Sequence, residues 1–576
     1  MSDYRGLCRG NVLESWAVMT IKVLGDTALL VEAPPLAAPA AAAWVRRATA
    51  AIRAENWPEV VEVVPALTGL ALHFRSTTEN AELDKRVHQH LESCFATESA
   101  TPLPAAREVE LPVCYEGKYG PDLPLVGEQA RLSPTAMAAA HAAGTYTVQA
   151  IGFSPGFPYL MGLDPKLACP RRATPRTSVP AGSVGIGGNQ TGVYPHASPG
   201  GWNIIGRTPE PLFDPRADDP CRLRAGDQLK FRAISAVEFE RHASALSRRD
   251  AGADPATESP AAIEVLLAGV QTTVQDRGRP GFQSLGVTEG GAVDRRALRL
   301  ANALVGNAPD AAVLEWPLRG PQLFFRDRRL VAVTGAIAVG VPFCRPFIVD
   351  AGEVLDLSQV PTGCRGIVAI SGGVEVPVVM GSRSTHLNGQ FGGFRGRALR
   401  KGDVLALGAT RVVGAKPGWM VSPSLSRPVT GDVAKVRVVR GPEEDLFDTR
   451  NWERLVDGTY VVSAHSDRMG MRLDGPQVRA HTATELTSGP VAAGTVQMPP
   501  DGQPIVLLAD RQSLGGYPRI AGVITVDLPV VAQVPPGSAL QFTEVSLAEA
   551  EDLRLQEERD FKRFESTVAS HFVLRS

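Results

Sequence analysis

The sequence predicts a mainly β protein with α+β character that is divided into several domains. Its 57 glycines and 46 prolines, with only 6% aromatic residues, are typical of short strands joined by tight turns. In Ile151–Pro209, Gly and Pro recur too densely for a long helix, yet large apolar side chains that need burial lie between them. At 576 residues the chain is too long for one hydrophobic core, so three or four domains are expected.

The first hundred residues alternate strand-like and helix-like stretches. Strands are predicted at Ile21–Glu32, which folds back at a Gly-Asp turn, at Glu59–Pro65 and at Gly69–Phe74, and helices at Pro39–Asn56 and Glu79–Phe95. This alternation predicts a small α/β domain over residues 21–105. Residues 1–20 contain charged side chains and no apolar core, so they are expected to be a disordered extension and not a signal peptide.

A second domain is predicted over residues 106–237. It begins with a strand at Arg107–Tyr115 and a helix at Leu132–Ala143, which Ser133 caps. From Ile151 onward the pattern is all β and ends in a predicted hairpin, Leu223–Phe231. Residues 238–260 are small or charged and offer few groups for packing, so an interdomain linker is expected there.

The second half is predicted to hold two more β domains, over residues 261–430 and 431–547, and a C-terminal helix and tail over 548–576. Strands are expected at Ile263–Val270, Leu323–Gly340, Phe343–Leu357 and Ile367–Gly373, and helices at Ala292–Gly306 and, on the surface, Ala548–Glu565.

An internal repeat relates the two halves. Ala181–Val184 is echoed by Ala493–Val496, Gln190 by Gln503, Gly200–Trp202 by Gly515–Tyr517, and the segment ending at Phe231 by the one ending at Phe542. The distance from Gly182 to Phe231 is 49 residues, and from Gly494 to Phe542 it is 48 residues. One β module used twice is therefore predicted, with chance similarity of Gly-rich turns as the alternative. A third, weaker copy is expected around Leu399–Leu407.

Charge and composition exclude several classes of protein. A formal net charge of −2 provides no field for nucleic acid or an anionic membrane surface, and no apolar run approaches the length of a membrane span. The seven cysteines are scattered singly, which suggests neither a zinc site nor a disulfide framework and fits a cytoplasmic protein. No Walker A, HExxH or GxSxG pattern occurs, and nothing resembles a biotin-attachment lysine motif.

Polar residues gather beside Gly-rich turns in four places. These clusters are Arg171, Arg172, Arg176, Gln190, Thr191, Tyr194 and His196; Gln275, Asp276 and Arg277 with Asn302 and Glu315; Ser382, Arg383, Ser384, His386 and Asn388; and Ser466, Asp467 and Arg468 with Asp510, Arg511 and Gln512. Arg presents a planar fork that suits carboxylate or phosphate, and neighbouring glycines allow close approach of the backbone. Two of these clusters contain an Asp directly followed by an Arg, in the pairs Asp276-Arg277, Asp467-Arg468 and Asp510-Arg511. These pairs could equally be structural ion pairs that fix loops.

Long ordered motifs carry a family resemblance. PVCYEGKYGPDL, GFSPGFPYLMGL, PRRATPRTSVPAGSVGIGGNQTGVYP and SPGGWNIIGRTP resemble the B subunit of 5-oxoprolinase, also described as allophanate hydrolase subunit 1, over residues 21–234. TTVQDRGRPGFQSLGV, GAVDRRALRLANALVGN, GSRSTHLNGQFGGFRGRALRKGDVL, SDRMGMRLDGP and DGQPIVLLADRQSLGGYPRIAGV resemble the C subunit of 5-oxoprolinase, or allophanate hydrolase subunit 2, over residues 263–558. The chain thus resembles a natural fusion of the B and C subunits.

The resemblance implies cyclophilin-like β-barrels and an activity. That activity is the ATP-dependent opening of 5-oxo-L-proline to L-glutamate together with a separate 5-oxoprolinase A subunit, with ATP as co-substrate and Mg²⁺ as its companion ion. Under this hypothesis the catalytic residues are Arg176, Gln190, His196, Asp467 and Arg511. Substrate or nucleotide would be bound by Arg171, Arg172, Thr191, Tyr194, Arg277, Arg383, Arg468, Asp510 and Gln512. No metal ligand is assigned, and homo-oligomer formation stays open.

Two alternatives come with the same resemblance. The two modules also form the carboxyltransferase part of urea carboxylase, which acts with biotin, and that function would need a separate biotin carrier. Related stand-alone proteins are described as regulators of a sporulation histidine kinase. Fusion disfavours this last function, because an inhibitor covalently joined to its antagonist would be hard to switch.

Overall fold

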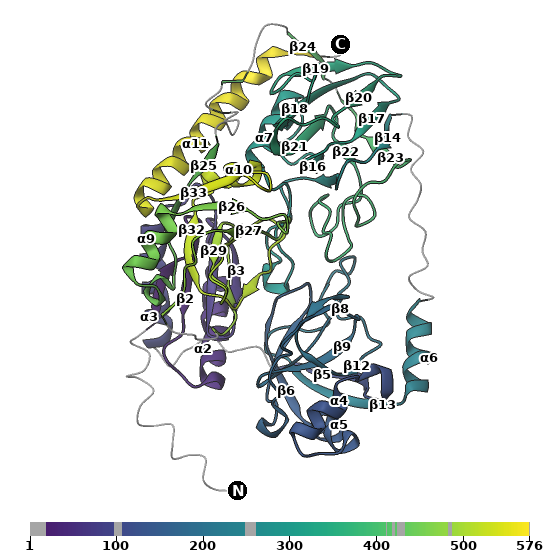
Figure 1. Cartoon of the computed structure of the whole chain (residues 1–576), viewed down its shortest axis with the longest axis vertical. Coiled ribbons are helices and arrows are strands. Elements are labelled where there is room, and N and C mark those ends of the chain that lie inside the picture. Colours follow the sequence, from purple (N-terminus) through teal and green to yellow (C-terminus); the bar gives the residue numbers. More distant parts are fainter. Residues whose placement is uncertain are drawn as a thin grey trace.

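The N-terminal domain is a four-stranded sheet covered by two helices (Figure 1). The computed structural model describes residues 19–96, 106–247, 261–410, 412–416, 421–422, 425, 432–481 and 486–574. Strands β1 (Thr20–Val23), β2 (Ala28–Glu32), β3 (Val60–Pro65) and β4 (Gly69–Phe74) lie in the order β1-β2-β4-β3, with helices α2 (Ala38–Glu55) and α3 (Asn80–Ala96). The elements match the predicted ranges, but the sheet is antiparallel throughout, so the domain is α+β.

Next along the chain is a closed seven-stranded barrel, here called barrel 1. Its strands are β5 (Glu108–Cys114), β6 (Thr145–Ile151), β7 (Pro158–Met161), β9 (Ser183–Gly187), β10 (Gln190–Val193), β12 (Asn203–Arg207) and β13 (Gln228–Ile234). Helices α4 (Leu123–Gln129) and α5 (Pro134–Ala143) pack on the barrel, and β8 (Arg176–Val179) pairs antiparallel with β11 (Ser198–Gly200) in a separate two-stranded sheet. Ser133 caps α5 as predicted, since its Oγ accepts from the N–H of Ala136 at 3.2 Å.

Two local predictions for this domain are wrong. The expected hairpin Leu223–Phe231 has only its second arm as a strand, because β13 pairs in parallel with β5 and antiparallel with β6 to close the barrel. The start of the expected linker is helix α6 (Ala236–Ser247), in which Phe239 is buried against the ring of Tyr119, with 4.5 Å between ring centroids. A small apolar cluster around Phe239, together with the bond from Tyr119 to Glu240, therefore holds a helix that the charged composition did not predict. Residues 248–260, like residues 1–18, lie outside the described part.

A middle domain with two five-stranded sheets opens the second half. One sheet has the order β20-β17-β14-β23-β22 and the other β15-β16-β21-β18-β19. The bounds are β14 (Ala262–Leu267), β15 (Thr273–Gln275), β16 (Val313–Pro317), β17 (Gln322–Phe325), β18 (Arg329–Ile337), β19 (Pro346–Val349), β20 (Val354–Asp356), β21 (Thr362–Ile370), β22 (Val374–Glu375) and β23 (Val404–Leu407). Helix α7 (Arg295–Leu304) packs on β18 and β21, and the short helix η4 (Gln283–Leu285) lies in the loop before it.

A second closed barrel, barrel 2, has the same strand arrangement as barrel 1. Its strands are β25 (Val433–Arg440), β26 (Thr459–Val462), β27 (Gly470–Asp474), β29 (Thr495–Gln497), β30 (Ile505–Leu507), β32 (Arg519–Val523) and β33 (Ala539–Glu544). Helices α9 (Thr449–Asp457) and α10 (Leu528–Gln533) and the pair β28 (Gly489–Pro490) and β31 (Leu514–Gly515) complete it. β24 (Val412–Ala415) pairs with the C-terminal β34 (Phe572–Leu574).

The internal repeat is confirmed by these two barrels. In each, the last strand pairs in parallel with the first, β13 with β5 and β33 with β25. Gly182 and Gly494 precede equivalent strands at φ of 80° and 85°. At Gly182 an added Cβ would lie 2.2 Å from the carbonyl oxygen of Thr208, so both the backbone and the space favour glycine. The prediction of a third copy around Leu399–Leu407 is wrong, because β23 of this segment pairs antiparallel with β14 in an open sheet.

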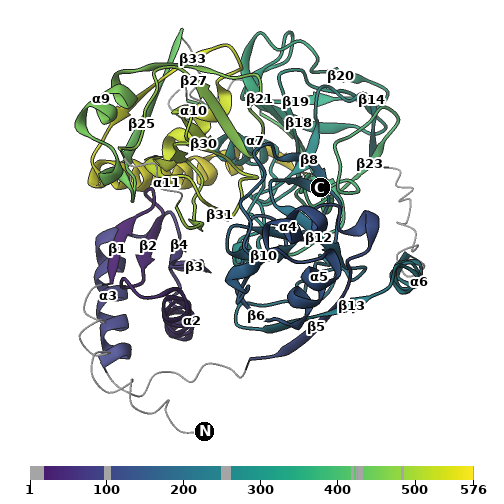
Figure 2. The same ribbon diagram turned by 60° about the horizontal axis from the view of Figure 1, so that its bottom comes forward.

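The N-terminal domain docks on barrel 2, although its sequence belongs to the first half. Figure 2 shows the N-terminal domain beneath barrel 2, with barrel 1 beside it, and in Figure 1 its strands overlap those of barrel 2. Leu24, Leu30 and Ala71 pack against Ala492 of barrel 2. The carboxylate of the buried Asp26 accepts from the backbone N–H and the hydroxyl of Thr525, at 2.7–3.1 Å.

Helix α11 (Leu547–Val568) joins three domains and is more than the surface helix that was predicted. Its Arg554 is 1% exposed, donates to the carbonyl oxygens of Ser76 and Thr78, and lies 3.8 Å from Asp26. On the same helix Glu558 pairs with Arg299 of α7. None of the helices in the described residues is long and apolar enough to cross a membrane.

We expect the Arg554→Ala variant to lower the free energy of unfolding by about 3 kcal/mol, because two carbonyl groups lose their donor and the buried Asp26 loses its neighbouring cation. Urea unfolding measures the change. Arg559→Ala is the matched control on the same helix, since Arg559 is exposed and bonds to the neighbouring Gln556. Equal losses in the two variants would contradict the assigned role of Arg554.

The core of barrel 1 contains a buried His141 that should make stability depend on pH. The imidazole is bonded to the hydroxyls of Tyr115 at 2.9 Å and Thr191 at 3.0 Å, and burial lowers the pKa of His141 to about 3. The unfolded chain therefore binds a proton below pH 6.5 that the folded chain does not bind. As the pH falls from 6.5 to about 4, we expect the free energy of unfolding of the wild type to decrease by about 1.4 kcal/mol per pH unit more than that of His141→Gln. Parallel curves of unfolding free energy against pH would show that this prediction is wrong.

Candidate functional site

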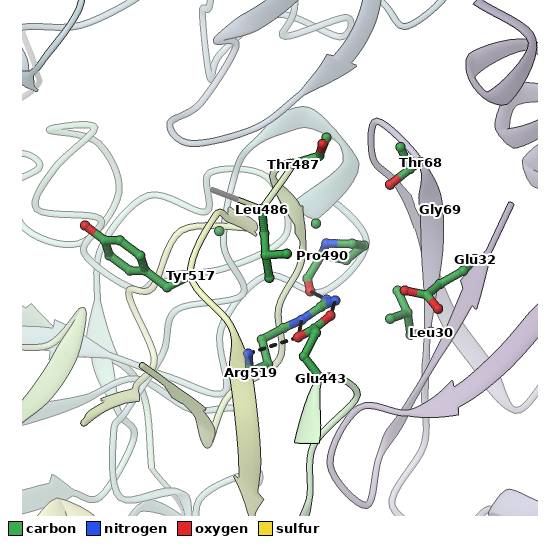
Figure 3. Close-up of a pocket in the computed structure, with 12 residues that line it drawn as sticks. Leu30, Glu32, Thr68, Gly69, Glu443, Leu486, Thr487, Pro490, Tyr517 and Arg519 are labelled. Atoms are coloured by element: carbon green, nitrogen blue, oxygen red, sulfur yellow. Dashed lines mark hydrogen bonds and ion pairs between the residues drawn. The ribbon is translucent and has the colours of Figure 1, made fainter. Parts of the chain in front are cut away.

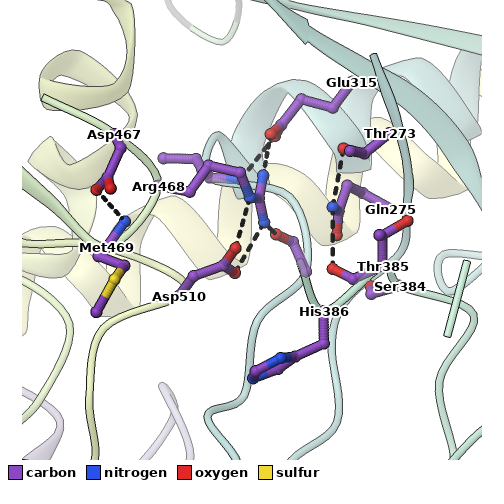
Figure 4. Close-up of polar contacts among 12 residues, drawn as sticks. Thr273, Gln275, Glu315, Ser384, Thr385, His386, Asp467, Arg468, Met469 and Asp510 are labelled. Atoms are coloured by element: carbon purple, nitrogen blue, oxygen red, sulfur yellow. Dashed lines mark hydrogen bonds and ion pairs between the residues drawn. The ribbon is translucent and has the colours of Figure 1, made fainter. Parts of the chain in front are cut away.

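A buried ion-pair network joins barrel 2 to the middle domain (Figure 4). Arg468, in the turn before β27, donates to Asp510 through Nε at 2.8 Å and through Nη2 at 3.0 Å, and it also pairs with Glu315 of β16. Its Nη2 donates to the carbonyl oxygen of Gly291 as well, at 2.7 Å. Burial alone would lower the pKa of Arg468, but the two carboxylates raise it above its usual range. Arg468 lowers the pKa of Asp510 against the opposing effect of burial, so both partners of this pair are charged.

Arg279 lies beside this network with part of its hydrogen-bonding capacity unused. It is 1% exposed, donates from Nη2 to the carbonyl oxygen of Ser384, and stacks over Phe391 with 5.0 Å between Cζ and the ring centroid. Its Nε and Nη1 have no hydrogen-bond partner among the described residues. Burial lowers the pKa of Arg279 to about 10, although Asp276 and Asp510 favour the charged form. Such N–H groups suit an anionic oxygen or ordered water.

His386 borders the same region. Its ring stacks on Phe391 with 4.7 Å between centroids, and Nδ1 accepts from the N–H of Gly389 at 2.9 Å. Burial lowers the pKa of His386 to about 4, so the imidazole is neutral near neutral pH. The ring of Phe391 is 5.7 Å from that of Phe213, which in turn contacts His196 of barrel 1 at 5.6 Å. A chain of ring contacts therefore links His196 to His386 and to Arg279.

Asp276 fixes the loop that carries Ser382, Arg383 and Ser384. One of its oxygens accepts from the hydroxyls of Ser382, at 2.7 Å, and of Ser384, and the other from the N–H of Arg383 at 2.5 Å. The guanidinium of Arg383 turns outward to Glu375 at 3.4 Å. Arg277 is exposed, so the buried arginine of this loop is Arg279 and not the predicted Arg277.

Arg511 lies at the meeting point of barrel 2, the middle domain and the N-terminal domain. It is 3% exposed, and its Nη2 donates to Oε1 of Gln283 at 2.7 Å. Its Nε has no partner among the described residues. Burial lowers the pKa of Arg511 to about 10, while Glu289 and Glu62 favour its charged form.

The predicted arginines of barrel 1 form a separate group around Asp122. Arg176 pairs with this carboxylate at 2.7 Å and Arg172 at 3.3 Å, while the other oxygen accepts from the N–H of Ile204. Arg171 is exposed, and its charge counters the effect of burial, which raises the pKa of Tyr194 to about 12. The structure thus brings Arg468, Asp510 and Arg511 together at one junction, whereas Arg172 and Arg176 pair with Asp122 of barrel 1.

Four further predicted residues have local contacts. Thr191 is buried inside barrel 1, where its hydroxyl is hydrogen-bonded to His141 and to the carbonyl oxygen of Gly185. Asp467 is exposed and caps its own turn by accepting from the N–H groups of Met469 and Gly470. Gln190 opens β10, and Gln512 lies near Gly515; both are half-buried.

A cavity of about 240 Å³ opens between the N-terminal domain and barrel 2 (Figure 3). Arg519 and Glu443 form a buried pair on one wall, and Glu32 faces them from β2. No residue that the sequence assigned to a site lines this cavity among the described residues. The repeat could have indicated Glu443, because it accepts from the N–H of Arg519 as Asp122 does from that of Ile204 at the equivalent position of barrel 1.

The sequence also missed Arg279, Gln283 and Glu62. Arg279 could have been predicted, because it lies two residues from Arg277 in the same Gly-rich loop. No neighbouring sequence pattern indicates Glu62, because its partner Gln283 is 221 residues away. In the described part of the chain, no three His, Cys, Asp or Glu side chains gather as a metal site requires. The unpaired N–H groups fit carboxylate or phosphate oxygens.

Two family profiles match the chain. The profile described as "Carboxyltransferase domain, subdomain C and D" matches residues 19–223, and "Carboxyltransferase domain, subdomain A and B" matches residues 285–544. The C subunit of 5-oxoprolinase from Escherichia coli K12 is 38% identical over 309 residues, which are 52% of this chain and 97% of that protein. The B subunit of 5-oxoprolinase from Bacillus subtilis 168 is 39% identical over 230 residues, which are 38% of this chain and 94% of that protein.

Two solved structures are also similar to this chain. The protein TTHA0988 is 32% identical with a TM-score of 0.75, and the match covers 91% of this chain and all of that one. The urea carboxylase of Kluyveromyces lactis is 26% identical with a TM-score of 0.51, over 65% of this chain and 37% of that one. This chain belongs to the carboxyltransferase-domain family, and it joins in one polypeptide a half related to the B subunit of 5-oxoprolinase and a half related to the C subunit.

Proposed function

We propose that this protein is the fused B and C component of an ATP-dependent 5-oxoprolinase, which opens 5-oxo-L-proline to L-glutamate together with a separate A subunit in the cytoplasm. The observation that carries the proposal is that each half matches nearly the whole length of a protein named as one of the 5-oxoprolinase subunits. The two halves also share buried polar contacts, which supports their action as one unit.

The chemistry of the reaction explains why buried arginines would be needed. The lactam of 5-oxoproline is a resonance-stabilised amide and a poor electrophile. Transfer of the γ-phosphoryl group of ATP to the lactam oxygen releases ADP and makes the ring carbon open to attack by water; ring opening then releases phosphate. Negative charge develops on phosphoryl oxygens during this transfer, and preorganised cationic donors stabilise it.

The N–H groups at the domain junction support specific roles. We assign the unpaired Nε of Arg511 and the unpaired Nε and Nη1 of Arg279 to anionic oxygens of substrate or nucleotide. Arg468 is occupied by two carboxylates, so it holds the junction together and positions Asp510. Arg172 and Arg176 retain unpaired Nε and Nη1 atoms respectively among the described residues, which keeps the barrel 1 group as a second anion site under this proposal.

A second candidate is a carboxyltransferase that works with a separate biotin carrier. The similarity to Kluyveromyces lactis urea carboxylase favours it. The two functions differ in a measurable way, since carboxyl transfer from biotin is blocked by avidin whereas ATP-dependent lactam opening is not. Glutamate release from 5-oxoproline that requires ATP and resists avidin would decide for the oxoprolinase.

The test is ATP-dependent glutamate release with and without the A subunit. We expect turnover by the purified pair and an approximately 100-fold or greater fall in kcat for Arg511→Ala, because one preorganised donor to developing charge is lost. Arg328→Ala is the control, since Arg328 is an exposed arginine of the middle domain that pairs with Asp350. Wild-type turnover in a folded Arg511→Ala variant would remove this residue from the site.

A further inference from the structure

A polar relay connects the N-terminal domain to Arg511 of barrel 2. Glu62 of β3 accepts from the N–H of Ser284 at 2.9 Å and from Nε2 of Gln283 at 3.3 Å. Gln283 in turn accepts at Oε1 from Nη2 of Arg511, at 2.7 Å. The three side chains of the relay Glu62–Gln283–Arg511 are only 6%, 4% and 3% exposed, and each comes from a different domain.

The chemistry of the end groups fixes the orientation of the middle group. An ionised carboxylate only accepts hydrogen bonds and a guanidinium only donates them. The Gln283 amide therefore satisfies both neighbours in one orientation, with its NH₂ toward Glu62 and its oxygen toward Arg511. The opposite orientation would place NH₂ against guanidinium and oxygen against carboxylate, two repulsive contacts in a buried site.

Anchoring one nitrogen of Arg511 sets the direction of the others. A guanidinium is planar and rigid, so a hydrogen bond at Nη2 determines where the Nε–H points. That Nε is the buried atom without a partner among the described residues. The other charged groups around Arg511 are Glu289, Arg295 and Asp510, and His73 also lies beside it with burial lowering its pKa to about 4. Arg295 is itself paired with Glu289 at 2.8 Å, so the amide of Gln283 is the group that holds Nη2.

We propose that Glu62 is a positioning residue that acts through Gln283 to aim the free Nε–H of Arg511 at an anionic oxygen. The N-terminal domain, which belongs to the half related to the B subunit, thereby completes a site in the half related to the C subunit. The catalytic consequence rests on the proposed function, whereas the orientation of Arg511 does not. Three variants distinguish the orientation of Arg511 from its catalytic consequence. They are the single variant Glu62→Gln, the exchange variant that combines Glu62→Gln with Gln283→Glu, and the control Glu59→Gln.

The single variant Glu62→Gln removes the fixed orientation of the Gln283 amide. The new amide at position 62 can still accept from Ser284, but it can both donate to and accept from Gln283. The Gln283 amide then has two orientations, and Arg511 loses a constant acceptor. The exchange restores that acceptor, because the amide at position 62 donates to a carboxylate at position 283, which accepts from Arg511.

The control changes a carboxylate of the same domain outside the relay. Glu59 pairs with Arg86, so Glu59→Gln removes a negative charge without touching Gln283. Any effect that Glu59→Gln shares with Glu62→Gln therefore reflects the loss of a charge from this domain and not the loss of the relay.

The rate at which phenylglyoxal labels Arg511, measured by peptide mass spectrometry, tests the relay without an activity assay. We expect Arg511 to be labelled at least about fivefold faster in Glu62→Gln than in the wild type, and at close to the wild-type rate in the exchange variant and in Glu59→Gln. In the oxoprolinase assay we expect kcat of Glu62→Gln to fall at least about 10-fold with KM nearly unchanged, and the exchange to recover most of it.

The outcomes distinguish the relay from the proposed function. Faster labelling of Arg511 that the exchange reverses supports the relay, even if the wild type opens no lactam and the proposed function fails. Unchanged labelling in a folded Glu62→Gln variant overturns the relay. If Glu62→Gln does not fold, the exchange variant decides: wild-type protection of Arg511 in it supports the relay, and fast labelling in it overturns the relay.

Discussion

The structure depends on the rule that a guanidinium removed from water needs partners for its charge and its N–H groups. In this chain several buried arginines find part of those partners in another domain. Arg468 of barrel 2 is held by Glu315 of the middle domain, and Arg554 of α11 by carbonyl groups of the N-terminal domain. Each such contact makes the burial of an arginine conditional on domain docking. The arrangement of the domains is therefore fixed by polar contacts that no single domain can satisfy, and not by apolar area alone.

The duplicated barrels show how an equivalent position acquires different chemistry. In both barrels an acid accepts a backbone N–H from the same strand of the repeat: Asp122 accepts from Ile204, and Glu443 from Arg519. In barrel 1 that acid also pairs with Arg176 of strand β8, whereas in barrel 2 it pairs with the side chain of Arg519 itself. The backbone contact is thus the shared feature, and the source of the guanidinium is what has changed. The barrel 2 pair now lines the cavity under the N-terminal domain.

Sequence patterns predicted those features that depend on nearby residues. Strand and helix ranges followed from periodicity and turns, and the repeat followed from Gly182 and Gly494, whose positive φ only glycine adopts easily. The errors have one physical origin. β13 finds both of its partners in strands far along the chain, and Arg279 is buried because Ser384 and Phe391, over 100 residues later, fold onto it. The sequence gives the type of side chain at each position, but it does not show which distant group will cover that side chain and remove it from water.

The position of the N-terminal domain bears on why two halves that resemble separate subunits occur together. Its sequence continues into barrel 1, yet the buried contacts of Asp26 and Glu62 are with barrel 2 and the middle domain. A half that contained only the middle domain and barrel 2 would leave Gln283 without the carboxylate that orients its amide. A half that contained only the N-terminal domain and barrel 1 would leave Glu62 without the N–H of Ser284. Because each half lacks a partner for a polar group that the other supplies, the junction around Arg511 is complete only when both halves are present.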